Sequence, residues 1–146
     1  MRRILFATDF SKASRKAFAT AVKTAKASGA ALTIVHVIAP FVPIAPDQYI
    51  GPETWEEIDK QSRRWANSHL NALTARTKAA GVRAKGFLVE GHPAREVTRL
   101  ARKSHADLVV IGTHGRTGFA KLFLGSIASQ IVATSRCPVM TVRGHR

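Results

Sequence analysis

The sequence predicts an α/β fold in which a doubly wound, five-stranded parallel sheet is covered by helices on both faces. Short apolar runs alternate with longer amphipathic segments along the chain, an order typical of parallel strands joined by crossover helices. The apolar runs have few polar interruptions, as expected for strands that are buried on both faces. A length of 146 residues allows one ordinary core, so a single domain over residues 1–146 is expected.

The first strand and helix are marked by the residues at their ends. Residues 3–8 are an apolar run that ends before Asp9, and Ser11 is a suitable N-cap for a helix over residues 12–28. Apolar residues recur in this helix at helical spacing while its lysines fall largely elsewhere, which predicts one buried face. Gly29 is expected to end the helix at the C′ position.

The next strand, over residues 31–37, has the β-branched content of a central strand. A loop with three prolines follows over residues 38–51 and is long enough to be functional. A long helix is expected over residues 52–80, with four acidic residues near its start, where the macrodipole favours negative charge. Its buried stripe is predicted to comprise Trp55, Ile58, Trp65, Ala72 and Leu73.

The second half of the chain repeats the alternation of strand and helix. Residues 83–89 are expected to form a strand, and Pro93 is expected to open the following helix. Residues 108–111 are wholly apolar and predict a fourth strand buried on both faces. A helix over residues 126–135 and a strand over residues 138–142 complete the order.

A glycine-rich segment follows the fourth expected strand. Gly112, Gly115 and Gly118 recur every three residues, and Gly125 leads with Ser126 into the next helix. Glycine lets backbone N–H groups approach a bulky anion, and the helix N-terminus adds unpaired N–H groups and partial positive charge. The segment therefore predicts a phosphate-binding site. Its spacing fits neither a Walker A loop nor a dinucleotide-binding fingerprint.

The pattern G-x-x-G at residues 112–115, followed after nine residues by Gly-Ser at residues 125–126, resembles the nucleotide-binding signature of the universal stress protein family. The resemblance covers essentially the whole chain. The opening T-D-F-S at residues 8–11 and the closing C-P-V at residues 137–139 are also similar to the family pattern. Ala7 departs from it, because many members have proline there.

The resemblance implies a strand order of 3-2-1-4-5 and an ATP site at the carboxyl ends of the first and fourth strands. It implies that Asp9 contacts the nucleoside and that the backbone at Val37 reads the adenine edge. A helix cap is the alternative role for Asp9, a core position for Val37, and a solvated loop face for His114 and Arg116. The candidate nucleotide-binding residues are Ala7, Thr8, Asp9, Val37, Gly112, Thr113, His114, Gly115, Arg116, Gly125, Ser126 and Ile127.

The resemblance also implies a homodimer that pairs through the last strand, Val139 to Val142. An open edge strand is a pairing hazard that a symmetric partner removes. The expected cofactor is ATP, with or without Mg²⁺ or Mn²⁺ held through its phosphates and Asp9. No set of His, Cys and carboxylate residues has metal-ligand spacing, so no metal ligand is assigned. The expected location is the cytoplasm.

The formal net charge of +14 raises the question of a nucleic-acid partner. Lysine and arginine are scattered over the first three expected helices without a dense block, and surface aromatics that would stack on bases are not evident, so such a partner is not expected. Residues 27–46 carry no charge, but Gly29 and three prolines favour a turn, a strand and a loop over a membrane helix. Cys137 is expected to be a buried, inert thiol. Structural roles are expected for His36, His69 and His105.

Two other classes of function stay open beside an ATP-binding regulator of a stress response. One is a slow ATPase that uses Asp9 and a metal ion. The other is a binding module for a protein or an anionic ligand that ignores nucleotides. Efficient phosphoryl transfer needs a charge clamp and a positioned base, and only one acid is expected beside the glycine loop. Binding is therefore favoured over turnover, and no catalytic residue is assigned.

Overall fold

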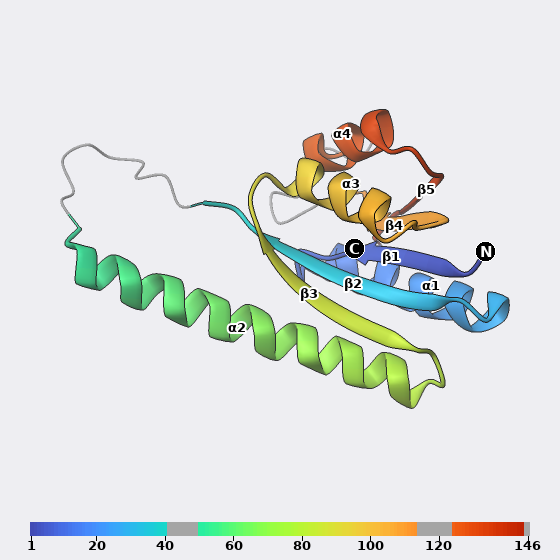
Figure 1. The fold of residues 1–146 in the computed structure, drawn as a ribbon, viewed down its shortest axis with the longest axis horizontal. Helices are drawn as coiled ribbons and strands as arrows, with labels where there is room; N and C mark the ends of the chain where they lie inside the picture. The colour runs from blue at the N-terminus through green and yellow to red at the C-terminus, as the bar shows by residue number, and fades with distance from the viewer. Residues whose placement is uncertain (41–49, 114–123, 145–146) are drawn as a thin grey trace.

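The computed structural model describes residues 1–40, 50–113 and 124–144. In these residues five parallel strands form one sheet in the order β3-β2-β1-β4-β5 (Figure 1). The predicted fold class and strand order are therefore confirmed. The strands are β1 (Arg3–Ala7), β2 (Ala31–Ile38), β3 (Ala84–Glu90), β4 (Leu108–Gly112) and β5 (Val139–Val142).

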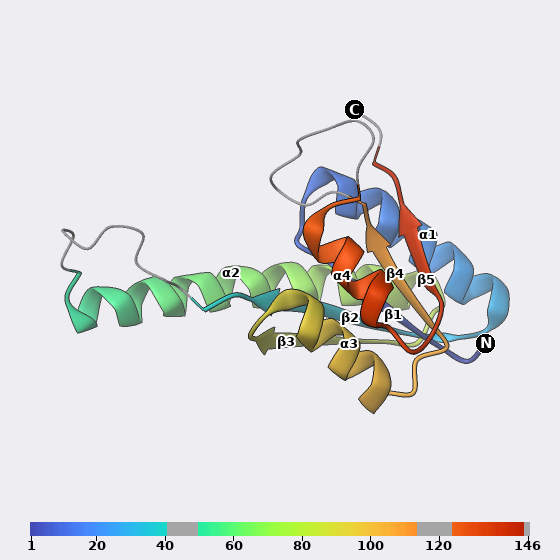
Figure 2. The ribbon, with the colours of Figure 1, turned by 90° about the horizontal axis from the view of Figure 1, so that it is seen from above.

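Two helices cover each face of the sheet, so the described residues form three layers. Helices α1 (Lys12–Ser28) and α2 (Pro52–Ala79) lie on one face, and α3 (Pro93–Lys103) and α4 (Ser126–Thr134) lie on the other (Figure 1, Figure 2). Successive strands are added on one side of β1 as far as β3 and on the other side from β4 onward. This reversal opens a crevice at the carboxyl ends of β1 and β4.

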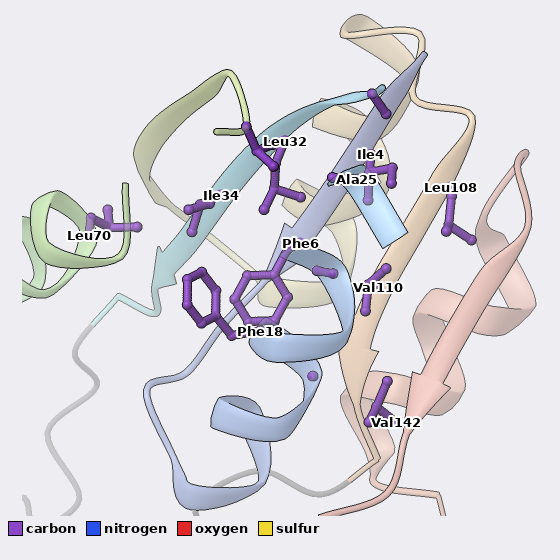
Figure 3. Close-up of a cluster of buried hydrophobic side chains, with 14 residues drawn as sticks. Ile4, Phe6, Phe18, Ala25, Leu32, Ile34, Leu70, Leu108, Val110 and Val142 are labelled. Atoms are coloured by element: carbon purple, nitrogen blue, oxygen red, sulfur yellow. The ribbon is translucent and has the colours of Figure 1, made fainter. Parts of the chain in front are cut away.

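Alternate residues of the central strands face two separate cores. Ile4 and Phe6 of β1 pack toward α1, where the Phe6 and Phe18 ring centroids are 5.7 Å apart (Figure 3). Leu5 and Val109 face the opposite core, beneath α3 and α4. Strands buried on both faces have to be apolar at consecutive positions, which explains the uninterrupted runs in the sequence.

The ends of α1 follow the predicted capping chemistry. The Ser11 hydroxyl accepts a hydrogen bond from the Ser14 N–H at 3.2 Å, as an N-cap does. Gly29 has φ 67°, a left-handed conformation that glycine adopts without a steric penalty, and its N–H bonds back to the last turn. Because α1 begins soon after β1 and its start is capped, the residues between the two elements, 8–11, are held in a fixed position.

The predicted buried stripe of α2 is largely wrong. Trp65 and Ile58 are each 43% exposed, and Ala72 is exposed too, whereas Ala66 and Leu70 are buried. The true contact stripe is therefore rotated from the predicted one. The first half of α2 extends beyond the end of the sheet (Figure 1), so its large apolar side chains have no sheet beneath them. Of the rest of the predicted stripe, Trp55 and Leu73 are partly buried.

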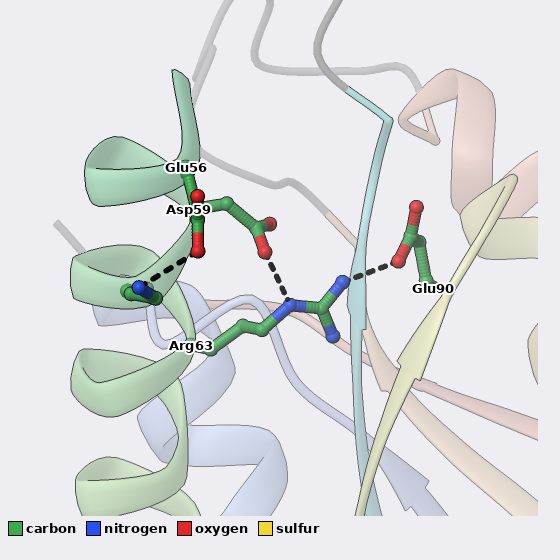
Figure 4. Close-up of polar contacts among 5 residues, drawn as sticks. Glu56, Asp59, Arg63 and Glu90 are labelled. Carbon is green, nitrogen blue, oxygen red and sulfur yellow. Dashed lines mark hydrogen bonds and ion pairs between the residues drawn. The ribbon is translucent and has the colours of Figure 1, made fainter. Parts of the chain in front are cut away.

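The extended half of α2 is tied to the sheet by polar contacts (Figure 4). Arg63 donates from Nε to Asp59 Oδ2 at 2.8 Å and pairs through Nη2 with Glu90 at the end of β3. The hydrogen bonds to Asp59 and Glu90 raise the pKa of the Arg63 guanidinium above its ordinary value. Because these groups are solvated, the pairs orient the helix more than they stabilise it.

A second prediction of burial is also wrong. Cys137 is partly exposed, and its Sγ lies 3.6 Å from the Ser135 hydroxyl, so the thiol is not enclosed in the core.

The described helices include none that is both long and apolar enough to cross a membrane.

Candidate functional site

A cavity of about 560 Å³ lies at the carboxyl ends of β1 and β4, where the strand order reverses. Nine of the twelve candidate residues line it, although they come from four separate parts of the chain. These nine are Ala7, Thr8, Asp9, Val37, Gly112, Thr113, Gly125, Ser126 and Ile127. The other three candidates, His114, Gly115 and Arg116, lie outside the described residues.

Further lining residues were not predicted from the sequence. They come mainly from the inner faces of β2, α3 and α4, and the set is Ser14, Val35, His36, Ala39, Pro93, Val97, Ile111, Ala128 and Ile131. Pro93 was recognisable in principle, since it opens a helix after a strand at the same edge of the sheet. Val97 follows it by one helical turn. The burial of the other side chains depends on how the helices cross the sheet, which no local pattern reveals.

Three helix N-termini contribute to the cavity wall. Ser14 lies in the first turn of α1, Pro93 begins α3, and Ser126 begins α4. The N-caps of α3 and α4, which are His92 and Gly125, make no side-chain capping bond. Each N-terminus carries the equivalent of about half a positive charge, and only that of α1 has a side-chain cap, which Ser11 provides. The convergence of three such ends favours a bound anion.

A hydrogen-bond network holds Asp9 in place just after the carboxyl end of β1. The Thr8 N–H donates to the Val35 carbonyl at 2.9 Å, and the Thr8 hydroxyl shares a buried 2.7 Å bond with the Ser14 hydroxyl. The same Thr8 oxygen accepts the Phe10 N–H at 3.0 Å. Asp9 Oδ1 accepts the Ser11 N–H at 3.0 Å, so one carboxylate oxygen supports the turn. The predicted alternative for Asp9, a cap of the first helix, is not observed, because Ser11 is the N-cap of α1; Asp9 supports the turn before the helix and lines the cavity as well.

Backbone bonds fix the two ends of the glycine-rich segment against each other. The Gly125 N–H donates to the Thr113 carbonyl at 2.7 Å, and the Thr113 N–H donates to the Val142 carbonyl at 3.0 Å. Thr113 is buried. These bonds hold the start of α4 beside the end of β4, and so bring the Gly125-Ser126 pair to Gly112 across twelve intervening residues.

Aromatic rings pack behind the Asp9 turn. Phe10 has φ 61°, uncommon for a residue with a side chain, and its ring centroid lies 4.5 Å from His36 and 5.3 Å from Trp65. His36 Nδ1 donates to the Thr8 carbonyl at 2.8 Å, which assigns the proton to that nitrogen because a carbonyl only accepts. The expected structural role of His36 is thus visible, and its side chain also reaches the cavity.

The lining suits a ligand that is part apolar and part anionic. Val37, Val97 and Ile131 offer an apolar wall, whereas the helix N-termini offer N–H groups and positive potential. Asp9 is the one acidic side chain among the described lining residues, and it suits hydroxyl donors. The described residues contain no group of three His, Cys, Asp or Glu side chains placed to hold a metal ion.

Comparisons with known proteins agree with this architecture. The model of the universal stress protein family matches residues 1–143. A universal stress protein of Thermus aquaticus is 36% identical over 142 residues, with 97% of this chain and 98% of the relative covered. Protein MJ0577 of Methanocaldococcus jannaschii has the same fold, with a TM-score of 0.84 at 22% identity over 99% of this chain and 97% of that one. A universal stress protein in complex with cAMP superposes with a TM-score of 0.73 at 26% identity, covering 99% of this chain and 98% of that one.

Proposed function

The chain belongs to the universal stress protein family, and we propose that it binds ATP in the cavity at the carboxyl ends of β1 and β4 and acts as a nucleotide-dependent regulator of a stress response. The observation that carries the proposal is the convergence of nine candidate residues on a cavity surrounded by three helix N-termini. A cavity of about 560 Å³ is in the usual range for small-molecule sites, roughly 300–1,000 Å³.

Each part of the nucleotide has a suitable counterpart in the wall. The base goes to the apolar side chains near Val37, and the ribose hydroxyls donate to Asp9. The phosphates go to the N–H groups at the start of α4, around Ser126 and Ile127. The relative in complex with cAMP supports an adenine nucleotide as the ligand class.

Binding rather than turnover is the proposed use of the site. Among the described lining residues, Asp9 is the one carboxylate, and its Oδ1 already supports the turn at Ser11. Asp9 would help to hold a divalent ion that accompanies the phosphates. The signal passed to other proteins is then the occupied or empty state of the cavity.

Titration calorimetry with ATP and with adenosine tests the placement of the phosphates. Ser126→Glu puts a carboxylate at the first residue of α4, where acidic residues stabilise the helix, so the variant is expected to fold. It is expected to bind ATP at least about tenfold more weakly because of charge repulsion, and to bind adenosine normally. The matched control is Ser129→Glu, on the same helix and not in the cavity wall. The proposal would be refuted if Ser126→Glu bound ATP as tightly as the wild type, or if the wild type bound no ATP at millimolar concentration.

The finer role of Asp9 is tested by Asp9→Asn with and without Mg²⁺. Asparagine keeps an oxygen for the Ser11 N–H, so the turn is retained while the charge is lost. Equal weakening of ATP and adenosine binding indicates a contact with the ribose. Weakening that depends on Mg²⁺ indicates that the carboxylate helps to hold the ion instead.

We also propose a homodimer that pairs through β5. This strand is one edge of the sheet, and Met140 on it is 36% exposed. Met140→Lys is expected to give a monomer in sedimentation velocity, because lysine on an edge strand opposes pairing. The control is Phe87→Lys on β3, the other edge, where Phe87 is 42% exposed. A monomeric wild type, or dissociation by the β3 variant alone, would contradict this interface.

A further inference from the structure

A second cavity, of about 520 Å³, lies at the other end of the layer formed by α3 and α4. It shares no lining residue with the first cavity and lies at the amino ends of β4 and β5. Figure 2 shows α3 and α4 close together on this face of the sheet. The lining residues are Arg95, Thr98, Arg99, Ala101, Arg102, His105, Ala106, Thr134, Arg136 and Cys137.

The spacing of arginine in α3 builds one wall of this cavity. Arg95, Arg99 and Arg102 follow one another at i, i+4 and i+7, so their side chains share a stripe of the helix. The opposite stripe, with Val97 and Ala101, is buried. Like charges at these spacings destabilise a helix. Glu96 is the one acidic residue of α3, so these like charges are only partly offset within the helix.

Glu96 orients two of the guanidinium groups. Its side chain is 9% exposed, and its carboxylate accepts from Arg99 Nε at 2.6 Å and pairs with Arg95 Nε at 3.5 Å. Both contacts use Nε, so the terminal NH₂ groups remain available. Within the part of the chain that the structure describes, those NH₂ groups have no hydrogen-bond partner. A buried carboxylate thus holds the Arg99 side chain by a hydrogen bond and attracts the more exposed Arg95, while the NH₂ donors of both face solvent.

The opposite wall brings a fourth guanidinium from a distant part of the sequence. Arg136 lies between α4 and β5, and with Arg102 it has no ion-pair partner among the described residues. Four exposed arginine residues therefore line the cavity together with the carboxyl-terminal ends of α3 and α4, and two of the four pair with the Glu96 carboxylate. Each helix end contributes the equivalent of about half a negative charge, so the cavity keeps a charge of about +2.

His105 adds a fifth donor under conformational strain. It has φ 50°, and it follows α3 at a position where glycine is usually preferred. The His105 N–H bonds to the Arg102 carbonyl at 3.1 Å, and the Ala106 N–H bonds to the Ala101 carbonyl at 2.9 Å. The turn would form more easily with glycine, and the histidine side chain that is present instead lines the cavity.

We propose that this arginine-lined cavity is a second ligand site, which takes a small compound with several phosphate groups. Guanidinium forks match phosphate oxygens in pairs, and four arginine residues that come from two walls of one concavity can contact more than one phosphate group. A concave site of this volume suits a small molecule better than a nucleic acid, whose phosphates lie along a line. The proposal does not depend on ATP binding in the first cavity.

The chain carries a built-in reporter for the test. Cys137 lines the cavity and is the only cysteine in the sequence, so the rate at which iodoacetamide alkylates the protein reports on this site alone. Inorganic tripolyphosphate is the probe, and sodium chloride keeps the ionic strength constant to remove general screening. Bound tripolyphosphate is expected to slow the alkylation at least about threefold, because it covers the thiol.

Two double variants locate the effect. Arg102→Gln with Arg136→Gln removes two cavity guanidiniums and leaves the clamp on Glu96 intact. It is expected to raise the tripolyphosphate concentration for half-protection at least about tenfold. Arg64→Gln with Arg83→Gln makes the same change in net charge at exposed positions outside the cavity, and is expected to behave as wild type.

Three results would overturn the proposal. The first is a wild-type alkylation rate that tripolyphosphate does not change at millimolar concentration. The second is equal protection in the two double variants, which would show that only net charge matters. The third is stronger protection by duplex DNA than by tripolyphosphate at equal phosphate concentration, which would make the surface a nucleic-acid site.

Discussion

Replacement of Thr8 by valine should reveal how much the network beneath Asp9 contributes to folding. Valine has nearly the same volume as threonine, so the change removes a hydroxyl and leaves the packing intact. The Thr8 oxygen makes two hydrogen bonds, at 2.7 Å with the Ser14 hydroxyl and at 3.0 Å with the Phe10 N–H. Both hydroxyl-bearing residues are buried, with Thr8 8% and Ser14 4% exposed.

The cost follows from the groups that lose their partners. Each lost bond is worth about 1 kcal/mol, and a buried hydroxyl left unpaired costs about 1–3 kcal/mol. Thr8→Val is therefore expected to lower the free energy of unfolding by about 3 kcal/mol. In a protein of this size that loss corresponds to a decrease in Tm of about 6–12 °C. Ser14→Ala leaves the bond from Phe10 to Thr8 in place, so a loss of about 1 kcal/mol is expected.

Urea unfolding followed by far-ultraviolet circular dichroism measures both variants, and an unchanged m-value confirms that the unfolding transition is comparable. Thr8→Ser serves as the control, because it keeps the hydroxyl and removes only a methyl group. A loss below about 0.5 kcal/mol for Thr8→Val would show that the network is not stabilising. A larger loss of stability for Ser14→Ala than for Thr8→Val would refute the conclusion that Thr8 is the central member of the network.

Three further predictions concern packing, charge and backbone conformation. Leu70→Ala is expected to cost about 2–5 kcal/mol in urea unfolding, since Leu70 is 3% exposed, and to cost more than Trp65→Ala; the reverse order would restore the predicted stripe of α2. The pKa of Asp107 lies below its ordinary value of 3.8, because two backbone N–H groups at the start of β1 donate to its carboxylate. The Asp107 carboxylate therefore stabilises the fold fully above pH 3.8, and this stabilisation is lost as the pH falls below that value. Asp107→Asn should make the free energy of unfolding depend less on pH in the acid range. An unchanged pH dependence would contradict the role of this carboxylate. Gly91→Ala should cost about 1–3 kcal/mol in thermal unfolding, since Gly91 has φ 143° and the new Cβ would lie 2.8 Å from a side-chain carbon of α3; Gly51→Ala, where a Cβ meets nothing within 4 Å, is the control that should cost less.

The order and ends of the elements could be predicted from the sequence because they depend on local chemistry. Consecutive apolar residues marked the strands, Ser11 capped α1, and Gly29 ended it in a left-handed conformation. The position of the first cavity was also predictable. Residues that follow parallel strands gather at one edge of the sheet, so Asp9 and Gly112 had to lie near each other once the strand order was given.

The tertiary structure alone decided which surfaces meet. Trp65 is more hydrophobic than Ala66, yet Ala66 is the buried one, because α2 packs against the sheet at an angle that its own sequence does not specify. The second cavity was equally hidden. Arg102 and Arg136 are separated by the glycine-rich segment and α4, and their side chains share a cavity only because β4 and β5 are neighbours. Periodicity describes one element at a time, whereas a site between elements is set by the packing of all of them.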